Sequence, residues 1–313
     1  MHRLTFISLL LPVAIAIAAC SDTVQRPGGG DDGGAGTDVR LAEDAGAVID
    51  AAIDAGGADD DAGVEADGGH DPDAGAVDDS GITDIGVTDG GVTCAQGVAP
   101  APGLVVTKSG PVQGTLDGGA YVWLGIPYAE PPMGRLRWRP PQLRGCWGGT
   151  LKTDAYGERC AQVDNEGAYS GGEDCLTLNV WTPADYAQGK SRPVMVFIHG
   201  GGHIQGSSSE ESADKSRVFD GKNLAGTVGA VVVTFNYRLG AFGFLAHEAF
   251  AAEDLAGAAG NYGILDQVAV LGWALDNVRG FGGDPDRVML FGESAGAVDV
   301  CMLLVSPKSG GLF

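Results

Sequence analysis

Two glycine-containing segments carry the residues that could do chemistry. Residues 292–296 read Gly-Glu-Ser-Ala-Gly and directly follow the apolar run 288–291. A serine on a tight turn between a strand and a helix can present its hydroxyl as a nucleophile. The second segment, 199–202, reads His-Gly-Gly-Gly after the apolar run 193–198. Its glycines allow backbone N–H groups to approach a developing negative charge closely. Alone this loop is equally consistent with a flexible turn, but together with Ser294 it predicts an oxyanion-binding loop.

The elements around these segments predict an α/β domain. Apolar residues recur on one face of a helix at Ile264, Leu265, Val268, Leu271, Leu275 and Val278. Gly-Gly-Asp-Pro at 282–285 ends that helix before the strand at 288–291. The apolar runs 193–198 and 230–235 predict strands covered on both faces, whereas 176–181 has alternating apolar positions.

The amino terminus has the pattern of an export signal. A short charged start precedes an apolar stretch at 4–19 and then Cys20. Residues 17–20 resemble the lipobox of bacterial lipoproteins, in which this cysteine becomes the lipid-bearing first residue. We therefore expect a lipid anchor at Cys20 in the cell envelope, with the outer membrane favoured because Ser21 is not aspartate. The alternative is an ordinary secretory signal.

Residues 21–100 consist mainly of Asp, Gly and Ala and carry most of the formal net charge of −22. Such a segment cannot bury enough apolar surface to offset its ordering entropy, so it predicts a disordered acidic tether. The aspartates at 59–61 and 71–73 lack the spacing of an EF-hand calcium loop. Residues 101–313 have the composition of a globular domain and no basic patch with aromatics, which argues against nucleic-acid binding.

Six cysteines in an exported chain indicate disulfides rather than metal ligands. Cys160 and Cys175 flank a short polar loop, and a bridge between them would add about 3 kcal/mol in the chain-entropy model. Cys94 and Cys146 could also pair, but the sequence alone leaves the connectivity open. Cys301 is expected to be a buried thiol.

Several motifs resemble those of the type B carboxylesterase and cholinesterase family, in the same order and with similar spacing. They run from about residue 110 to 313 and comprise 124–129, 173–183, 236–245, 260–267 and 281–296. The resemblance implies an α/β-hydrolase fold, with a mostly parallel central sheet and helices on both faces, that ends after the serine turn. It also implies hydrolysis of a small-molecule carboxylic ester through an acyl-serine intermediate, with no metal or cofactor.

The resemblance assigns roles to individual residues. Ser294 would be the nucleophile, and the backbone amides of Gly201, Gly202 and Ala295 would form the oxyanion hole. A Cys160–Cys175 disulfide and a structural ion pair between Arg137 and Glu173 are implied as well. Glu293, beside the nucleophile, would either influence the charge of the site or form a structural hydrogen bond.

Three positions depart from the family pattern. His203 replaces the aromatic residue that usually follows the third glycine, Asp299 stands where serine is frequent, and Cys301 occupies a small-residue position. An aspartate in a packed helix requires a partner, so a local hydrogen bond to Asp299 is expected.

The family's triad carboxylate and histidine are expected beyond Phe313. The chain has five histidines, and none stands at the expected position of the base. His203 or His247 is a poor substitute, since His247 is expected to cap or decorate a surface helix. The strand before Ser294 would also lie at an apolar sheet edge, so we expect residues 101–313 alone to be poorly soluble. The alternatives to an enzyme are a non-catalytic binding module and an inert gene fragment.

Overall fold

The computed structural model describes Cys94 and residues 99–164, 167–254 and 257–313. The predicted signal, the lipid-bearing Cys20 and the acidic tether lie outside the described residues. In the described part, no helix has the length and apolar character needed to cross a bilayer.

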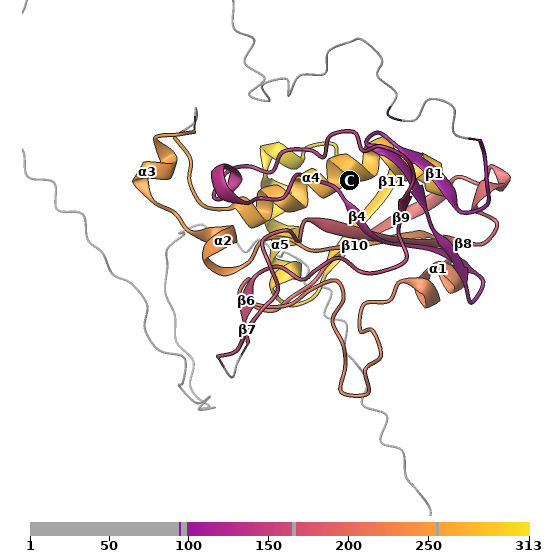
Figure 1. Cartoon of the computed structure of the whole chain (residues 1–313), viewed down its shortest axis with the longest axis horizontal. Coiled ribbons are helices and arrows are strands. Elements are labelled where there is room, and N and C mark those ends of the chain that lie inside the picture. The colour runs from indigo at the N-terminus through magenta and orange to yellow at the C-terminus, as the bar shows by residue number, and fades with distance from the viewer. Residues whose placement is uncertain (1–93, 95–98, 165–166, 255–256) are drawn as a thin grey trace, which may run out of the picture. The chain divides into compact units, whose positions relative to one another are not determined.

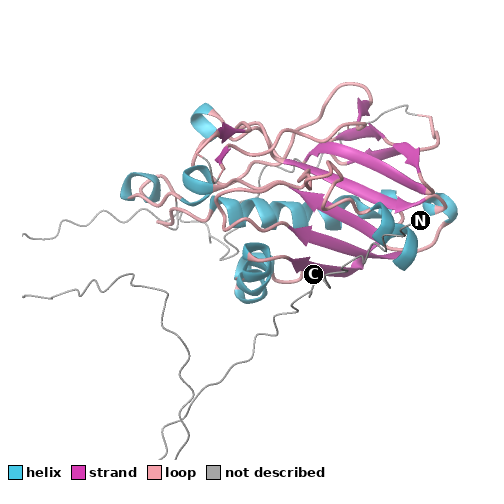
Figure 2. Cartoon of the chain, turned by 90° about the horizontal axis from the view of Figure 1, so that it is seen from below, coloured by secondary structure: helices cyan, strands magenta, loops and turns pink. Residues whose placement is uncertain are grey.

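A six-stranded sheet forms the centre of the domain, in the order β11-β9-β10-β8-β4-β3 (Figure 1; Figure 2). Its strands are β3 (Thr115–Asp117), β4 (Ala120–Pro127), β8 (Thr177–Pro183), β9 (Arg192–Ile198), β10 (Val231–Phe235) and β11 (Gly283–Gly292). The strands β11, β9 and β10 are parallel, whereas β8, β4 and β3 are added in antiparallel pairs. The expected parallel arrangement thus applies to the three strands that approach the serine turn, and the described sheet as a whole is mixed.

Two smaller sheets flank the centre, one made of β1, β2 and β5 and the other of β6 and β7. Their bounds are β1 (Leu104–Thr107), β2 (Gly110–Gln113), β5 (Leu151–Lys152), β6 (Gln162–Val163) and β7 (Tyr169–Ser170). The helices are α1 (Lys222–Val228), α2 (Gly240–Phe244), α3 (Glu248–Ala251), α4 (Tyr262–Asn277) and α5 (Ala295–Val305). Short 3-10 turns cover Gly134–Leu136, Tyr186–Gln188, Val278–Phe281 and Pro307–Ser309.

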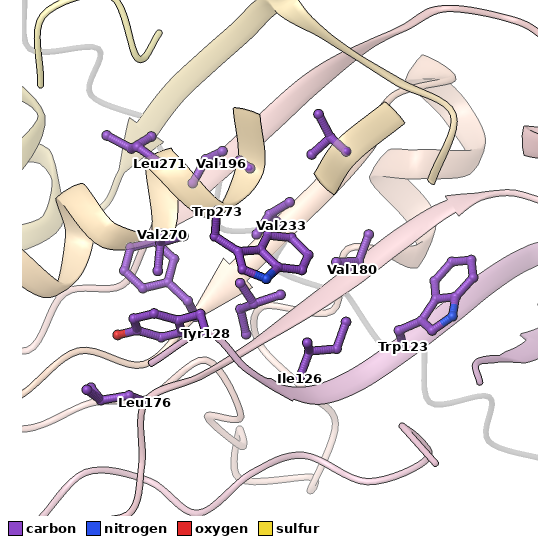
Figure 3. Packing of buried hydrophobic residues seen from close by; sticks show 14 of the residues in the cluster. Trp123, Ile126, Tyr128, Leu176, Val180, Val196, Val233, Val270, Leu271 and Trp273 are labelled. Atoms are coloured by element: carbon purple, nitrogen blue, oxygen red, sulfur yellow. The ribbon is translucent and has the colours of Figure 1, made fainter. Parts of the chain in front are cut away.

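Both faces of the central sheet are covered by helices. Successive strand residues point to opposite faces, so Val180 of β8 joins the larger apolar cluster while Trp181 joins the smaller one. The larger cluster packs the α4 residues Val270, Leu271 and Trp273 against the sheet (Figure 3). The smaller cluster packs Ala225 of α1 against the other face. This covering makes β8 buried across both faces, where the sequence pattern had predicted alternation.

The buried side of α4 agrees in part with the predicted face. Leu271 and Val278 are fully buried, and Ile264 and Val268 are partly buried but pack against the core. The fully buried side also includes Asp266 and Gln267. Both polar side chains have buried partners, described below, which allows them to lie in the interior.

The strand β11 forms one edge of the described sheet. It pairs with β9, and no other described strand lies against it. Its register shifts between Gly283 and Val288, where Asp284 accepts a hydrogen bond from the Asp286 amide at 3.1 Å. From Val288 to Gly292 the pairing is regular, which brings the end of β11 beside Ile198 at the end of β9.

Both cysteine pairs considered in the sequence are disulfides in the structure, Cys94–Cys146 and Cys160–Cys175. The second bridge closes a 15-residue separation.

We expect Cys160→Ser/Cys175→Ser to lower the free energy of unfolding by about 3 kcal/mol, because the unfolded chain regains loop entropy. Urea denaturation of the full protein would measure this loss. An unchanged urea midpoint in this double variant would contradict the prediction.

Candidate functional site

Ser294 lies on a strained turn between β11 and α5. Its φ of 53° and ψ of −120° are rarely adopted by residues other than glycine. The side chain is exposed. A Cβ on Gly292 would lie 2.4 Å from backbone atoms of Gly296, and one on Gly296 would lie 2.2 Å from the Ile198 carbonyl oxygen. Only glycine therefore fits at positions 292 and 296. The start of α5 packs directly against the end of β9 at this turn.

The glycine loop begins at the carboxyl end of β9, directly beside the serine turn. An ideal Cβ built on Gly200 would lie 3.0 Å from the Cβ of Ser294, so the two segments are in contact. The loop turns tightly because the Gly201 carbonyl accepts hydrogen bonds from the amides of Ile204 and Gln205, both at 3.1 Å. Gly201 has φ 101° and Gly202 has φ 62°. These left-handed conformations require the glycines that the sequence supplies.

Three backbone amides at this contact are available to a ligand. Within the described residues, the N–H groups of Gly201, Gly202 and Ala295 donate to no protein acceptor. Gly201 is half-buried and Ala295 is buried, where amides usually have a partner, whereas Gly202 is exposed. The N-terminal amides of a helix, such as that of Ala295, also attract negative charge. The loop and the first residue of α5 thus present unpaired donors around Ser294.

Tyr237 and His199 pack against each other at the start of the glycine loop. The Tyr237 hydroxyl donates to the His199 carbonyl oxygen at 2.9 Å, and the two rings stack with centroids 4.4 Å apart. Burial lowers the pKa of His199 to about 4. The ring is therefore neutral at physiological pH, and its Nδ1–H donates to the Gly200 carbonyl oxygen at 2.9 Å. Burial also raises the pKa of Tyr237, so its hydroxyl remains a donor.

His203 and Asp299, two of the departures from the family pattern, are hydrogen-bonded to each other. His203 Nε2 lies 2.8 Å from Asp299 Oδ1, and Gln267 Nε2 donates to Asp299 Oδ2 at 2.6 Å. Burial raises the pKa of the Asp299 carboxyl, whereas the hydrogen bonds from Gln267 and His203 act in the opposite direction. The partner that Asp299 requires thus comes from the glycine loop and from α4. The sequence indicated this need but did not identify the residues.

A polar cavity of about 520 Å³ adjoins the loop and is lined in part by Gly200, Glu293, Glu210 and Arg159. Glu293 is exposed and lines this cavity. Of the two roles considered for Glu293, this position favours an electrostatic influence on a bound molecule over a structural hydrogen bond.

The other site residues considered in the sequence lie away from Ser294 or support the fold. Arg137 donates two hydrogen bonds to Glu173, each 2.5 Å long, close to the Cys160–Cys175 bridge. Cys301 lies on α5 and is half-buried, whereas the sequence predicted a buried thiol. The helix α5 packs against the sheet through other residues, among them Leu303.

The described histidines are bound to partners other than Ser294. His247 caps α3, where its Nδ1 accepts the Ala249 amide at 3.1 Å, as the sequence had indicated. Among the hydrogen bonds of the described residues, none joins the Ser294 hydroxyl to a histidine. The same part of the chain contains no group of three or more His, Cys, Asp or Glu side chains that could hold a metal ion.

Comparison with known proteins identifies the family. A model of the Carboxylesterase family matches residues 101–313. The chain is 46% identical over 211 residues to the fumonisin B1 esterase of Sphingopyxis macrogoltabida, covering 66% of this chain and 37% of that protein. It is 42% identical over 218 residues to the para-nitrobenzyl esterase of Bacillus subtilis, covering 67% and 42% of the two chains. The chain belongs to the carboxylesterase family.

Solved structures agree on the fold. A PNB esterase superimposes with a TM-score of 0.61 at 41% identity, covering 68% of this chain and 42% of that one. The carboxylesterase of Geobacillus stearothermophilus gives a TM-score of 0.60 at 43% identity, covering 67% and 42%. The domain therefore has the α/β-hydrolase fold of these esterases. The chain spans about two fifths of the length of the relatives that it matches.

Proposed function

We propose that the protein is a serine carboxylesterase that hydrolyses small-molecule carboxylic esters. One observation carries this proposal, namely the exposed Ser294 held in contact with a loop whose amides have no protein acceptor. Membership of the carboxylesterase family supports the same reaction class. The polar cavity is lined by Glu293 and by Gly200, which contacts Ser294, and it offers space for part of a substrate.

In the proposed reaction, the Ser294 hydroxyl oxygen attacks the ester carbonyl carbon, and its proton passes to a histidine base outside the described residues. The carbonyl electron pair moves to the oxygen, whose negative charge accepts hydrogen bonds from Gly201, Gly202 and Ala295. Collapse of this intermediate expels the alcohol, which takes the proton from the base, and leaves an acyl-serine. Water then attacks the acyl group by the same route and releases the acid.

A fluorophosphonate probe tests the nucleophile. The full protein should be labelled at Ser294, and peptide mass spectrometry should place the adduct in the peptide that contains residues 292–296. Labelling at a different serine, or none with a probe that reacts with other carboxylesterases, would contradict the proposal.

Gly201 provides a test of the oxyanion loop. A Cβ at this position would lie 2.0 Å from the Gln205 carbonyl oxygen, and φ is 101°. We expect Gly201→Ala to move the loop amides and lower kcat about 100-fold or more, since the loss of one oxyanion donor has an effect of this size. Hydrolysis of a 4-nitrophenyl ester would measure it.

Gly119→Ala is the matched control for this prediction. Gly119 also has a positive φ, 89°, but a Cβ there meets no atom within 4 Å. It should cost about 1–2 kcal/mol of stability, because alanine disfavours a positive φ, and leave kcat unchanged. Equal kcat values for the two variants would argue against a catalytic loop.

We also propose that the protein is exported and attached to the membrane of the cell envelope through lipid on Cys20. The apolar stretch at 4–19 and the lipobox-like residues 17–20 support this. Cys20→Ser should abolish incorporation of labelled palmitate and release the protein from the membrane fraction. If the wild-type protein incorporated no palmitate, the alternative of an ordinary secretory signal would be favoured instead.

A further inference from the structure

A hydrogen bond links the loop that carries the unpaired amides to α5, the helix that Ser294 precedes. His203 follows Gly202 directly, and its Nε2 lies 2.8 Å from Oδ1 of Asp299 on α5. Asp299 is fully buried, and its second oxygen is held by Gln267 of α4. The carboxylate is therefore shielded from solvent and held by α4, so it provides an anchor for the His203 side chain.

His203 itself is held on three sides. Its backbone φ is 60°, an unusual value for a residue other than glycine. Its carbonyl oxygen accepts the Gly240 amide at 2.6 Å, and its ring packs on Phe244 with centroids 4.9 Å apart. Side-chain contacts of this kind are needed to maintain an unfavourable backbone conformation. These contacts hold His203, which directly follows the residues whose amides are unpaired, Gly201 and Gly202.

We propose that His203 is a positioning residue, which through Asp299 fixes the amides of Gly201 and Gly202 relative to the Ser294 hydroxyl. The inference rests on the proposed esterase function. Asp299 lies on α5 five residues after Ser294, so the bond joins the two halves of the site through one rigid helix. The two departures from the family pattern are then coupled, because histidine at 203 supplies the hydrogen bond that a buried aspartate at 299 requires.

Enzymes lose about 100-fold in rate when reacting groups are displaced by about 1 Å. A loop released from Asp299 should therefore hold the oxyanion less well, while initial binding of the ester changes little. We expect His203→Phe in the full protein to lower kcat for a 4-nitrophenyl ester about 30-fold to 100-fold, with KM changed less than about threefold. His203→Gln, which can still donate to Asp299, should retain most of the wild-type kcat.

The coupling is tested by Asp299→Ser and by the double variant His203→Phe/Asp299→Ser. Both single changes break the same bond, so the loss in the double variant should not exceed the larger single loss. His247→Phe is the matched control, since His247 caps α3 and should leave kcat unchanged. If His203→Phe lowered stability but kept the wild-type kcat, His203 would have only a structural role. If the kcat loss of the double variant equalled the product of the two single losses, the two residues would not be coupled.

Hydrogen exchange separates failure of this inference from failure of the esterase proposal. In His203→Phe, the amides of residues 200–206 should exchange faster than in wild type, whereas in His247→Phe they should not. If wild-type protein neither hydrolyses esters nor reacts with a fluorophosphonate, the esterase proposal fails, and the exchange experiment still tests the link. Unchanged exchange in His203→Phe would overturn the link in either case.

Discussion

Replacing Ser294 with alanine in the full protein should lower kcat for a 4-nitrophenyl ester by about 10⁴-fold to 10⁶-fold, as loss of the nucleophile does in serine hydrolases of known mechanism. Alanine keeps the Cβ and the same φ of 53°, so the strain of the turn is retained. The thermal midpoint should therefore shift little. Activity and unfolding measured on the same preparation would separate loss of chemistry from loss of structure.

Ser306→Ala is the control for this variant. Ser306 lies on the same segment, where its hydroxyl accepts the Lys308 amide at 3.3 Å as the cap of the last 3-10 turn. Loss of a cap costs about 1 kcal/mol of stability and should leave kcat unchanged. If Ser294→Ala retained the wild-type rate, the serine would not be the nucleophile, and the binding-module alternative would gain support.

The second large effect is expected at the buried ion pair between Arg238 and Asp266. The Arg238 Nε and Nη2 donate to the two carboxylate oxygens at 2.8 and 2.7 Å, and the Arg238 backbone amide donates at 3.0 Å. The side chains are 3% and 0% exposed. Asp266→Leu would leave a buried guanidinium without its counter-ion. We expect a loss of about 3–5 kcal/mol in the free energy of unfolding.

Two further variants make this prediction specific. Arg238→Met/Asp266→Leu removes both charges and should recover most of the loss, because neither group is left unpaired. Asp117→Asn breaks the surface pair with Lys222, whose side chains are 61% and 30% exposed, and should cost less than about 1 kcal/mol. Chemical denaturation would measure all three. Equal losses from Asp266→Leu and Asp117→Asn would contradict the role of burial.

The Arg238–Asp266 pair also matters for the site. Arg238 follows Tyr237, whose hydroxyl donates to the carbonyl oxygen of His199 at the start of the glycine loop. The pair fixes this segment on α4. Loosening it should therefore affect the loop as well as global stability, and activity of Asp266→Leu should fall before the protein unfolds.

Much of the site could be predicted from the sequence because its backbone requirements leave few choices. Gly292 and Gly296 fit the closely packed turn around Ser294, and Gly201 and Gly202 adopt conformations that glycine tolerates. Such local requirements appear directly in a sequence. The apolar runs predicted two strands, which are β9 and β10. β10 is buried at every residue, as expected of a strand covered on both faces, whereas β9 alternates between buried and half-buried residues.

The parts that were missed depend on contacts between distant residues. The burial of Asp266 and Gln267 on α4 was missed because both residues are polar by type, and only their partners Arg238 and Asp299 make burial favourable. The alternation predicted for β8 failed for a related reason. Asn179 is buried there through hydrogen bonds from its side chain to Ser208 and Thr234, at 3.0 Å each. Pattern analysis of one segment contains no information about such partners.

The central claim is that the hydroxyl of Ser294 and the amides of Gly201, Gly202 and Ala295 face the same point. A crystal structure of the full protein after reaction with a phosphonate ester tests it most directly. We predict a covalent bond from Ser294 Oγ to phosphorus, with the phosphonyl oxygen about 2.7–3.1 Å from the three amide nitrogens. A Ser294 adduct whose phosphonyl oxygen points to solvent, away from residues 200–202, would contradict the account.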